Sequence, residues 1–302
     1  MLKLLNSSIL KLGIAVTLVL VYSSMATANN RANSAATINT STVSELQDSK
    51  NNKIYQDLID RITEDLPQPS IGELVQTVAR QFLGAKYQAG LLDRSPQETL
   101  VISLQQFDCL LFVETVLAIA SNIAKEQYSY RAFTEEVEDR RYWNGKMNGY
   151  CSRLHYFSDW IEDNQRRNNV ENITSKLGGV DTIKKLNFMT THRGSYPNLA
   201  KNEANFQCIA RVEDSLSSKF NYIPTQEIRQ VYSQLQPGDI IGVATDIAGL
   251  DFTHTGFVYR QPNGDIGFIH ASPAGEVVIA ADLQNYIANV KNALGIVVTR
   301  AK

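Results

Sequence analysis

The chain has 302 residues, of which 43% are hydrophobic and 20% are charged, so it has enough apolar material for one large globular core. Its 29 basic and 31 acidic residues give a net charge of −2 at pH 7. This near balance excludes the strongly basic surface that nucleic-acid binding requires, and we expect no nucleic-acid partner.

Residues 1–28 have the layout of a secretory signal peptide. Lys3 and Lys11 flank short runs ahead of the main apolar stretch, and Ala26 and Ala28 fit an A-x-A cleavage site. The apolar stretch is shorter than the roughly 20 residues that cross a bilayer, although an uncleaved N-terminal anchor is the alternative. We therefore expect a periplasmic or secreted protein with no membrane anchor after signal cleavage.

Residues 29–50 are rich in Asn, Ala, Ser and Thr and show no apolar period, which predicts a disordered linker. The folded domain is then expected over residues 51–302. Within it, Ser70-Ile71-Gly72-Glu73 has the spacing of a capping box, which predicts a helix that runs to Leu83. Tyr87 follows in a loop next to glycines, and residues 99–104 are strand-like or irregular.

Residues 107–120 are almost entirely apolar. Asp108 is a good N-cap, and no Gly or Pro follows it in this stretch. This pattern predicts a helix that is buried on every face at the centre of the domain. Cys109 then lies in the first turn, where the helix dipole favours a thiolate and is expected to lower the thiol pKa. Cys109 is therefore a candidate nucleophile, and the alternative is a small buried core residue.

The chain has three cysteines, Cys109, Cys151 and Cys208. That number is too low for a disulfide scaffold and leaves at least one thiol unpaired. The simplest allocation bridges Cys151 to Cys208 and leaves Cys109 free, but the sequence leaves the pairing open.

Residues from about 125 to 235 are polar and mixed, and we expect them to form a large insertion. Residues 140–143 and 153–160 concentrate aromatic and basic side chains. Such a cluster fits binding of a sugar or an acidic peptide, and it fits equally well a helix with one aromatic face in the core.

Short segments of strand character follow from residue 235 onward, with turn signals between them. Closely spaced strands of this kind indicate an antiparallel sheet. Helices first and strands afterwards give an α+β domain. The predicted strands are residues 239–244, 253–260, 265–271, 276–280 and 294–300.

His254 and His270 lie on consecutive predicted strands, separated by Gln261-Pro262-Asn263-Gly264. A two-residue Asn-Gly turn would place the two histidines on opposite faces of the hairpin. A three-residue turn with Gly264 in the left-handed region would pair Gln261 with Asp265 and place both histidines on one face. Proline and glycine at these positions suit the three-residue turn.

A cysteine at a helix N-terminus and two histidines on one face of a hairpin supply a nucleophile, a base and a group that orients the base. In this hypothesis His254 takes the proton from Cys109 and later delivers it to the leaving amine. His270 holds the imidazole of His254 in its working tautomer. The backbone amide of Cys109 is a natural donor to the oxyanion.

Four motifs occur in a fixed order: Asp-Cys-x-x-Phe-Val at 108–113, Leu-Gln-Pro-Gly-Asp at 235–239, His-Thr-Gly-Phe-Val-Tyr at 254–259 and Phe-Ile-His-Ala at 268–271. Together they resemble the NlpC-type cell-wall cysteine hydrolases, secreted enzymes with a papain-like fold that cut amide bonds in bacterial peptidoglycan. The resemblance implies an α+β domain in which a buried N-terminal helix carries the cysteine and packs on a C-terminal antiparallel sheet.

The same resemblance implies roles for particular residues. Cys109 would be the nucleophile, His254 the base and His270 the third polar residue of a triad. Tyr87 matches the tyrosine whose hydroxyl supports the oxyanion site in that family.

The sequence departs from the usual family pattern, because two leucines replace Ser-Gly after the cysteine and 145 residues separate Cys109 from His254. Over most of residues 55–300 it looks like a divergent branch described as N-acetylmuramoyl-L-alanine amidase-like. The resemblance implies that the insertion helps to shape the substrate groove. The candidate substrate contacts are Asp108, Arg153, His155 and Tyr156.

The resemblance implies hydrolysis of an amide in peptidoglycan or muropeptides through a cysteinyl acyl-enzyme, with no cofactor and no metal. The branch favours the bond between the lactyl group of muramic acid and L-Ala, and the bond between D-Glu and the diamino acid is the alternative. Two further hypotheses are a zinc amidase with Cys109, His254 and His270 as ligands and a non-catalytic wall-binding protein. No short zinc-binding motif is present in the sequence.

Overall fold

The computed structural model describes residues 40–64, 69–216 and 219–302. Residues 41–302 form one compact unit. The predicted signal peptide and the first part of the predicted linker lie outside the described residues. Within the described residues, none of the helices combines the length and the hydrophobicity that crossing a bilayer requires.

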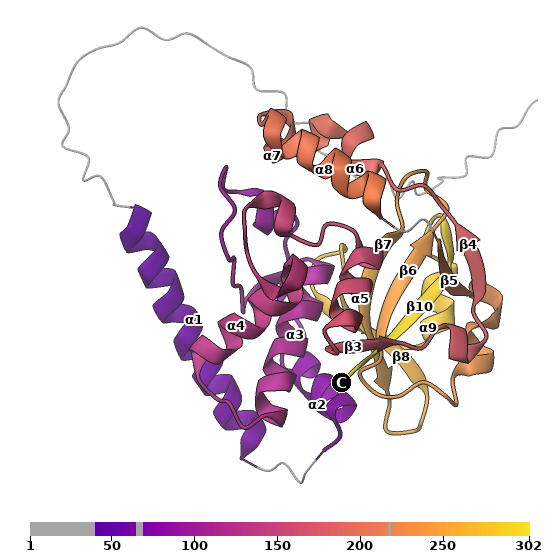
Figure 1. Ribbon diagram of the computed structural model, residues 1–302. Helices are drawn as coiled ribbons and strands as arrows, with labels where there is room; N and C mark the ends of the chain where they lie inside the picture. The colour runs from indigo at the N-terminus through magenta and orange to yellow at the C-terminus, as the bar shows by residue number, and fades with distance from the viewer. Residues whose placement is uncertain (1–39, 65–68, 217–218) are drawn as a thin grey trace, which may run out of the picture. The chain divides into compact units, whose positions relative to one another are not determined.

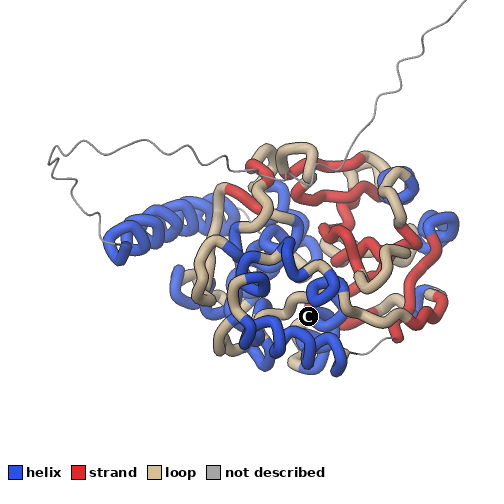
Figure 2. The backbone as a smooth tube through the Cα atoms, turned by 90° about the horizontal axis from the view of Figure 1, so that it is seen from above, coloured by secondary structure: helices blue, strands red, loops and turns tan. Residues whose placement is uncertain are grey.

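Helix α1 (Thr40–Thr63) includes residues 40–50, which were predicted to be disordered. Its C-terminal half buries Tyr55, Leu58, Ile59 and Ile62 in the main core. Once that half is fixed, each further residue adds a hydrogen bond at little entropic cost, so the helix extends through a polar segment that has no apolar period of its own. Residues 47–50 are accordingly exposed, and the start of α1 extends away from the core (Figures 1 and 2).

The capping box is confirmed at the start of helix α2 (Ile71–Arg80), where Ser70 and Glu73 cap each other. The helix ends three residues before Leu83, and Gly84 follows with a φ of 79°. Two short parallel strands, β1 (Lys86–Tyr87) and β2 (Gln106–Phe107), then flank a loop in which residues 99–103 have no regular structure.

The central helix α3 (Cys109–Ala124) is confirmed. Asp108 caps it by accepting a hydrogen bond from the Leu111 amide at 2.8 Å, and every residue from Leu111 to Ile123 is buried. It packs against strands β7 and β8, and the rings of Phe112 and Phe257 meet edge to face at 5.7 Å.

Residues 125–235 do not form a separate lobe, because part of the segment completes the main core and part extends the sheet. Phe133, Val137 and Trp160 pack in the same core as α3. Helices α6 to α8 lie above this core (Figure 1) and build a small core of their own around Leu199 and Ile209. The elements of the segment are α4 (Tyr130–Arg141), α5 (Phe157–Arg166), β3 (Val170–Asn172), β4 (Val180–Ile183), α6 (Phe188–Thr191), α7 (Pro197–Ala200), α8 (Glu203–Ser215) and β5 (Lys219–Pro224), with short 3₁₀ turns between them.

All five predicted C-terminal strands are confirmed, each within one residue at either end. They belong to one antiparallel sheet that also contains β4 and β5. Its strand order is β4-β5-β10-β6-β7-β8-β9, and β3 pairs with β10. A short helix, α9 (Leu283–Ala288), was not predicted. The strands are β6 (Ile240–Thr245), β7 (Phe252–Arg260), β8 (Ile266–Ala271), β9 (Val277–Ala280) and β10 (Ala293–Ala301).

Alternate residues of these strands point into two different cores, because successive side chains of a strand project to opposite faces. Phe257 and Ile269 join the core around α3. Val258 and Phe268 join a second core beneath α9. The protein is therefore an α+β domain with N-terminal helices and a C-terminal antiparallel sheet that is covered on both faces.

Candidate active site

Cys109 is the first residue of α3, and its side chain is partly exposed. The structure corrects the expectation that its thiol is acidic. Burial of the sulfur and the neighbouring Asp108 carboxylate raise the pKa of the Cys109 thiol to about 12. Backbone amides, including that of Thr255, favour the thiolate, but they do not outweigh the loss of solvent. The thiol is therefore neutral at pH 7.

The hairpin between β7 and β8 has the three-residue turn that the sequence predicts. Gly264 has a φ of 90° and donates its amide to the Gln261 carbonyl at 2.9 Å, while the Gln261 amide bonds to the Asp265 carbonyl at 2.9 Å. The strand pairing continues from Arg260 opposite Ile266. Both histidines consequently lie on one face of the hairpin.

Nε2 of His254 lies 2.7 Å from Nδ1 of His270, a direct hydrogen bond between two buried imidazoles. Burial lowers the pKa of His254 to about 3, with a further contribution from His270, and it lowers the pKa of His270 to about 4. Both rings are therefore neutral at pH 7, and one of them donates to the other. If His254 donates from Nε2, its Nδ1 has a free lone pair and can act as a base.

Two tyrosines lie beside Cys109. Burial raises the pKa of Tyr87 and of Tyr286 to about 12, and the charge of a Cys109 thiolate would add to both shifts. The ring of Tyr286 also contacts both imidazoles, with its centroid 4.5 Å from that of His270 and 6.2 Å from that of His254. Both hydroxyls are therefore neutral hydrogen-bond donors at pH 7, and Tyr286 links the thiol to the histidine pair.

Sequence reasoning found Tyr87 and missed Tyr286. Tyr286 lies on α9, a helix of six residues capped by Asp282. Two signals were available: the Asp282 cap and the i, i+4 pair of Leu283 and Ile287, which anchor the helix in the second core. Among the described residues, Cys109 makes no hydrogen bond to His254 or His270. Cys109 is connected to the histidine pair indirectly, because it interacts with the backbone amide of Thr255, the neighbour of His254, and with Tyr286.

A cavity of about 200 Å³ has Asp108 and Leu110, the chain neighbours of Cys109, in its wall. All four predicted substrate contacts line it together with further apolar and aromatic residues. The full lining is Gly90, Leu92, Asp93, Asp108, Leu110, Tyr150, Arg153, Leu154, His155, Tyr156, Met189, Tyr196 and Leu250.

The polar atoms of the four predicted contacts are largely occupied by the protein itself. Arg153 is buried and pairs with Asp93 at 2.6 Å and with Glu98 at 3.7 Å. Nε2 of His155 bonds to a backbone carbonyl at 2.9 Å, and the hydroxyl of Tyr156 donates to Glu213 at 2.6 Å. Asp108 caps α3.

Burial also disfavours the charged forms of the other ionisable groups of this wall. Burial and the nearby Arg153 lower the pKa of His155 to about 3. Burial raises the pKa of Asp108, although the backbone amide of Leu111 favours its carboxylate. The cavity therefore offers ring faces and apolar surface, with its charges already paired or suppressed.

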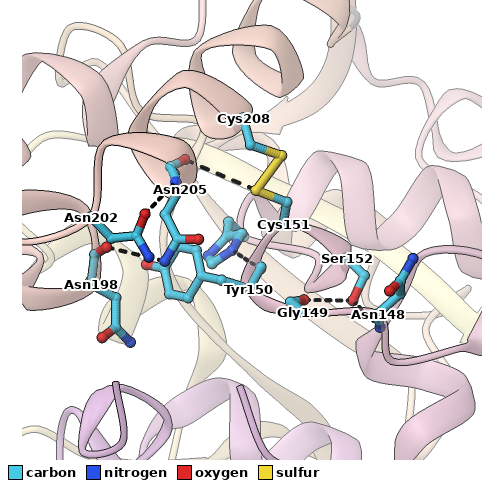
Figure 3. Close-up of a disulfide and its surroundings, with 10 residues drawn as sticks. Asn148, Gly149, Tyr150, Cys151, Ser152, Asn198, Asn202, Asn205 and Cys208 are labelled. Carbon is cyan, nitrogen blue, oxygen red and sulfur yellow. Dashed lines mark hydrogen bonds between the residues drawn. A yellow bond between two sulfur atoms is a disulfide. The ribbon is translucent and has the colours of Figure 1, made fainter. Parts of the chain in front are cut away.

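The cavity wall is covalently tied to helix α8. Cys151 and Cys208 form a disulfide, as the simplest allocation of the cysteines predicted, and Cys109 is free (Figure 3). Cys151 follows Tyr150, whose ring lies 4.6 Å from that of His155. The bridge thus holds the loop that carries two lining residues against α8.

A family model and several solved structures match the chain. Residues 77–296 match the AmiA-like family, described as N-acetylmuramoyl-L-alanine amidase-like. The structure is similar to that of an N-acetylmuramoyl-L-alanine amidase from Bacteroides uniformis, with 29% identity and a TM-score of 0.73, over 77% of this chain and 99% of that chain.

Two further structures are similar. A candidate xylanase from Bacteroides fragilis has 31% identity and a TM-score of 0.67, over 74% of this chain and 99% of that chain. A Legionella pneumophila protein of the DUF1460 family shares the fold at 22% identity, with a TM-score of 0.65, over 87% of this chain and 97% of that chain. No curated protein sequence matches the chain. Since the family match covers most of its length, the protein belongs to the N-acetylmuramoyl-L-alanine amidase-like family.

Proposed function

We propose that this protein is a cysteine-dependent amidase of the NlpC type, with a papain-like arrangement of helix and sheet, that hydrolyses the bond between the lactyl group of muramic acid and L-Ala in peptidoglycan. The observations that support the proposal are a free thiol at the start of α3, which interacts with the Thr255 amide and with Tyr286, and a hydrogen-bonded pair of buried histidines that Tyr286 also contacts. Thiol, base and orienting group are the set that acyl transfer requires.

The neutral resting state of the site defines the first chemical step. Nδ1 of His254 takes the proton from Cys109 as the sulfur attacks the carbonyl carbon, so that a C–S bond forms while the carbonyl oxygen gains a negative charge. His270 accepts the Nε2 proton of His254 in a hydrogen bond and thereby stabilises the imidazolium. Because the thiol pKa is near 12, this transfer occurs together with attack and does not precede it.

The backbone amide of Cys109 and the hydroxyl of Tyr87 donate to the oxyanion. Collapse of the tetrahedral intermediate breaks the C–N bond, and His254 delivers its proton to the leaving amine of L-Ala. The product is a thioester between Cys109 and the lactyl carbonyl. Water, deprotonated by His254, then hydrolyses the thioester and regenerates the thiol.

The cavity beside Cys109 supports a muramoyl substrate. Its aromatic rings and compensated charges suit a neutral sugar ring with an apolar face, since carbohydrate rings stack on aromatic side chains. A D-Glu residue on the acyl side would instead bring an ionised carboxylate to a wall whose arginine, Arg153, already pairs with Asp93 and Glu98.

The alternatives fit the site less well. A xylanase, as the Bacteroides fragilis structure is described, would use two carboxyl groups, whereas the groups of the proposed site are a thiol and two imidazoles. A zinc amidase needs three ligands on one metal, and no group of three or more His, Cys, Asp or Glu within the described residues has such a geometry. The N-terminal 28 residues fit export, so the proposed site of action is the periplasm or the cell exterior.

The test is mass spectrometry of muropeptides digested by the mature protein, with Cys109→Ala as the control. Stem peptides that begin at L-Ala, released by the wild type and not by the variant, are the expected result. Fragments that end at D-Glu would identify an endopeptidase with the same triad. Equal digestion by both proteins, with the variant shown to be folded by circular dichroism, would refute the role of Cys109.

A further inference from the structure

A second cavity, of about 520 Å³, lies between α1 and the loop that leads to Cys109. None of the proposed catalytic residues lines it. Its wall combines polar and apolar surface and comes from two parts of the chain. The lining residues are Gln47, Lys50, Asn51, Leu91, Arg94, Ser95, Thr99, Val101, Ile102, Ser103, Gln105 and Gln106.

The charge of this cavity is positive. Lys50 and Arg94 are its charged lining residues, and both are exposed. Neither makes an ion pair within the part of the chain that the structure describes. The nearby carboxylates face elsewhere: Asp93 and Glu98 pair with Arg153.

The α1 side adds no compensating charge. Asp48 lines a different hollow, on the side of α1 that faces α4. The cavity therefore presents two uncompensated cations and, among the described residues, no lining carboxylate.

Hydrogen-bond donors surround the two cations. The hydroxyl oxygens of Ser95 and Ser103 each accept a backbone amide at 3.2 Å, so their protons remain available to donate. The side-chain amides of Gln105 and Gln106 also lie on the wall. Two cations, two hydroxyl donors and two amides match an anion with several oxygen atoms, and a carboxylate is the anion that a peptide supplies.

The cavity is joined to the active site through one short segment. Leu92 and Asp93 line the cavity beside the thiol, whereas Leu91 and Arg94 line the second cavity. Gln106 lies three residues before Cys109, and β2, which contains it, pairs with the strand of Tyr87. A chain that leaves the scissile amide covers about 3.3–3.6 Å per residue, so the four residues of a stem peptide reach about 13–14 Å from it.

We propose that this second cavity binds the carboxylates of the stem peptide on the leaving-group side of the scissile amide. The inference rests on the proposed function, because it takes its ligand from that reaction. It assigns to Lys50 and Arg94 the recognition of a substrate part that the thiol and the histidines do not touch.

The experiment measures binding without turnover. Full-length mature protein with Cys109→Ala is titrated by calorimetry with the free tetrapeptide L-Ala-γ-D-Glu-diaminopimelate-D-Ala. In this background the double variant Lys50→Gln/Arg94→Gln is expected to bind about two- to thirtyfold more weakly, the range for two exposed charge pairs. The matched control is Lys53→Gln/Arg61→Gln, which removes the same charge from exposed positions of α1 outside the cavity and should bind as the parent does.

Two ligand controls complete the design. A tetrapeptide with amidated carboxyl groups is expected to bind the parent as weakly as the natural peptide binds the double variant, and inorganic phosphate at millimolar concentration should not compete. Equal affinities of both double variants, or full affinity for the amidated peptide, would overturn the inference. Competition by phosphate would show a general anion site and would overturn it as well. These outcomes do not depend on turnover, so failure of the amidase assignment would be seen separately, in the muropeptide digest.

Discussion

Replacing the bridged residues Cys151 and Cys208 by serine is expected to lower the free energy of unfolding by about 4 kcal/mol. The bridge closes a loop with a sequence separation of 57. In the chain-entropy model, a loop of this length removes about 14 cal/mol/K of entropy from the unfolded state, which is about 4 kcal/mol at 25 °C. For a domain of this size, each kcal/mol shifts Tm by about 2–4 °C, so Tm should fall by about 8–16 °C.

The assay is urea unfolding followed by circular dichroism, with Cys109→Ala in both proteins so that no free thiol can exchange with the bridge. Reduction of the parent should reproduce the loss, and reduction of the double serine variant should have no effect. In proteins that keep Cys109, the double serine variant should also have a higher KM for muropeptides at 20 °C, because the loop with Tyr150 and His155 is then held by packing alone. A loss of stability below about 1 kcal/mol would refute the reasoning from loop closure.

Three further results are expected. His270→Ala should lower kcat for muropeptides by about 100-fold or more with little change in KM, because His254 loses the partner that fixes its tautomer; a change confined to KM would contradict this. Tyr286→Phe keeps the ring contacts and should lower kcat about tenfold or more. Tyr232→Phe, which removes a hydroxyl that accepts a hydrogen bond from the Gln284 amide of α9, should leave kcat unchanged. The pKa values of His254, His155 and His270 are lowered to about 3, 3 and 4. The contribution of these three histidines to the free energy of unfolding is complete above pH 6.5. It falls as the pH drops towards 4, by about 1.4 kcal/mol per pH unit for each histidine. A Tm that stays constant from pH 7 to pH 4.5 would contradict this.

The parts of the fold that the sequence predicted are those governed by local rules. The register of His254 and His270 follows from a turn of three residues, because Pro262 and Gly264 each favour one backbone conformation. The capping box at Ser70 and the N-cap at Asp108 are equally local. These rules act within a few residues of chain, so no tertiary information is needed to apply them.

The parts that could not be predicted depend on contacts between distant segments. Arg141 on α4 pairs with Glu114 on α3 at 2.6 Å, and both side chains are buried. Residues 125–235 appear polar in sequence partly because such pairs hide their charges inside the core. Tyr286 is a similar case, since a helix of six residues is stable only where the sheet beneath it supplies an apolar surface.

The acidity of Cys109 is a third case, in which two physical effects oppose each other. The helix N-terminus favours the thiolate by a modest amount that depends on solvent exposure, whereas burial disfavours it by an amount that only the folded structure reveals. Burial is the larger effect here. The sequence contains the first effect and not the second, so the predicted direction of the pKa shift was wrong.

The raised pKa also explains how one chain can hold a disulfide and a free thiol together. Oxidants and disulfides react with the thiolate, so a thiol with a pKa near 12 is protected at neutral pH. Cys151 and Cys208 can therefore pair without competition from Cys109. In the proposed mechanism Cys109 must therefore be activated during the reaction, and the neutral pair of His254 and His270 would provide the base for that step. Under this proposal the same burial would keep the thiol reduced before the substrate arrives and would make its reactivity depend on the histidine pair once the substrate is bound.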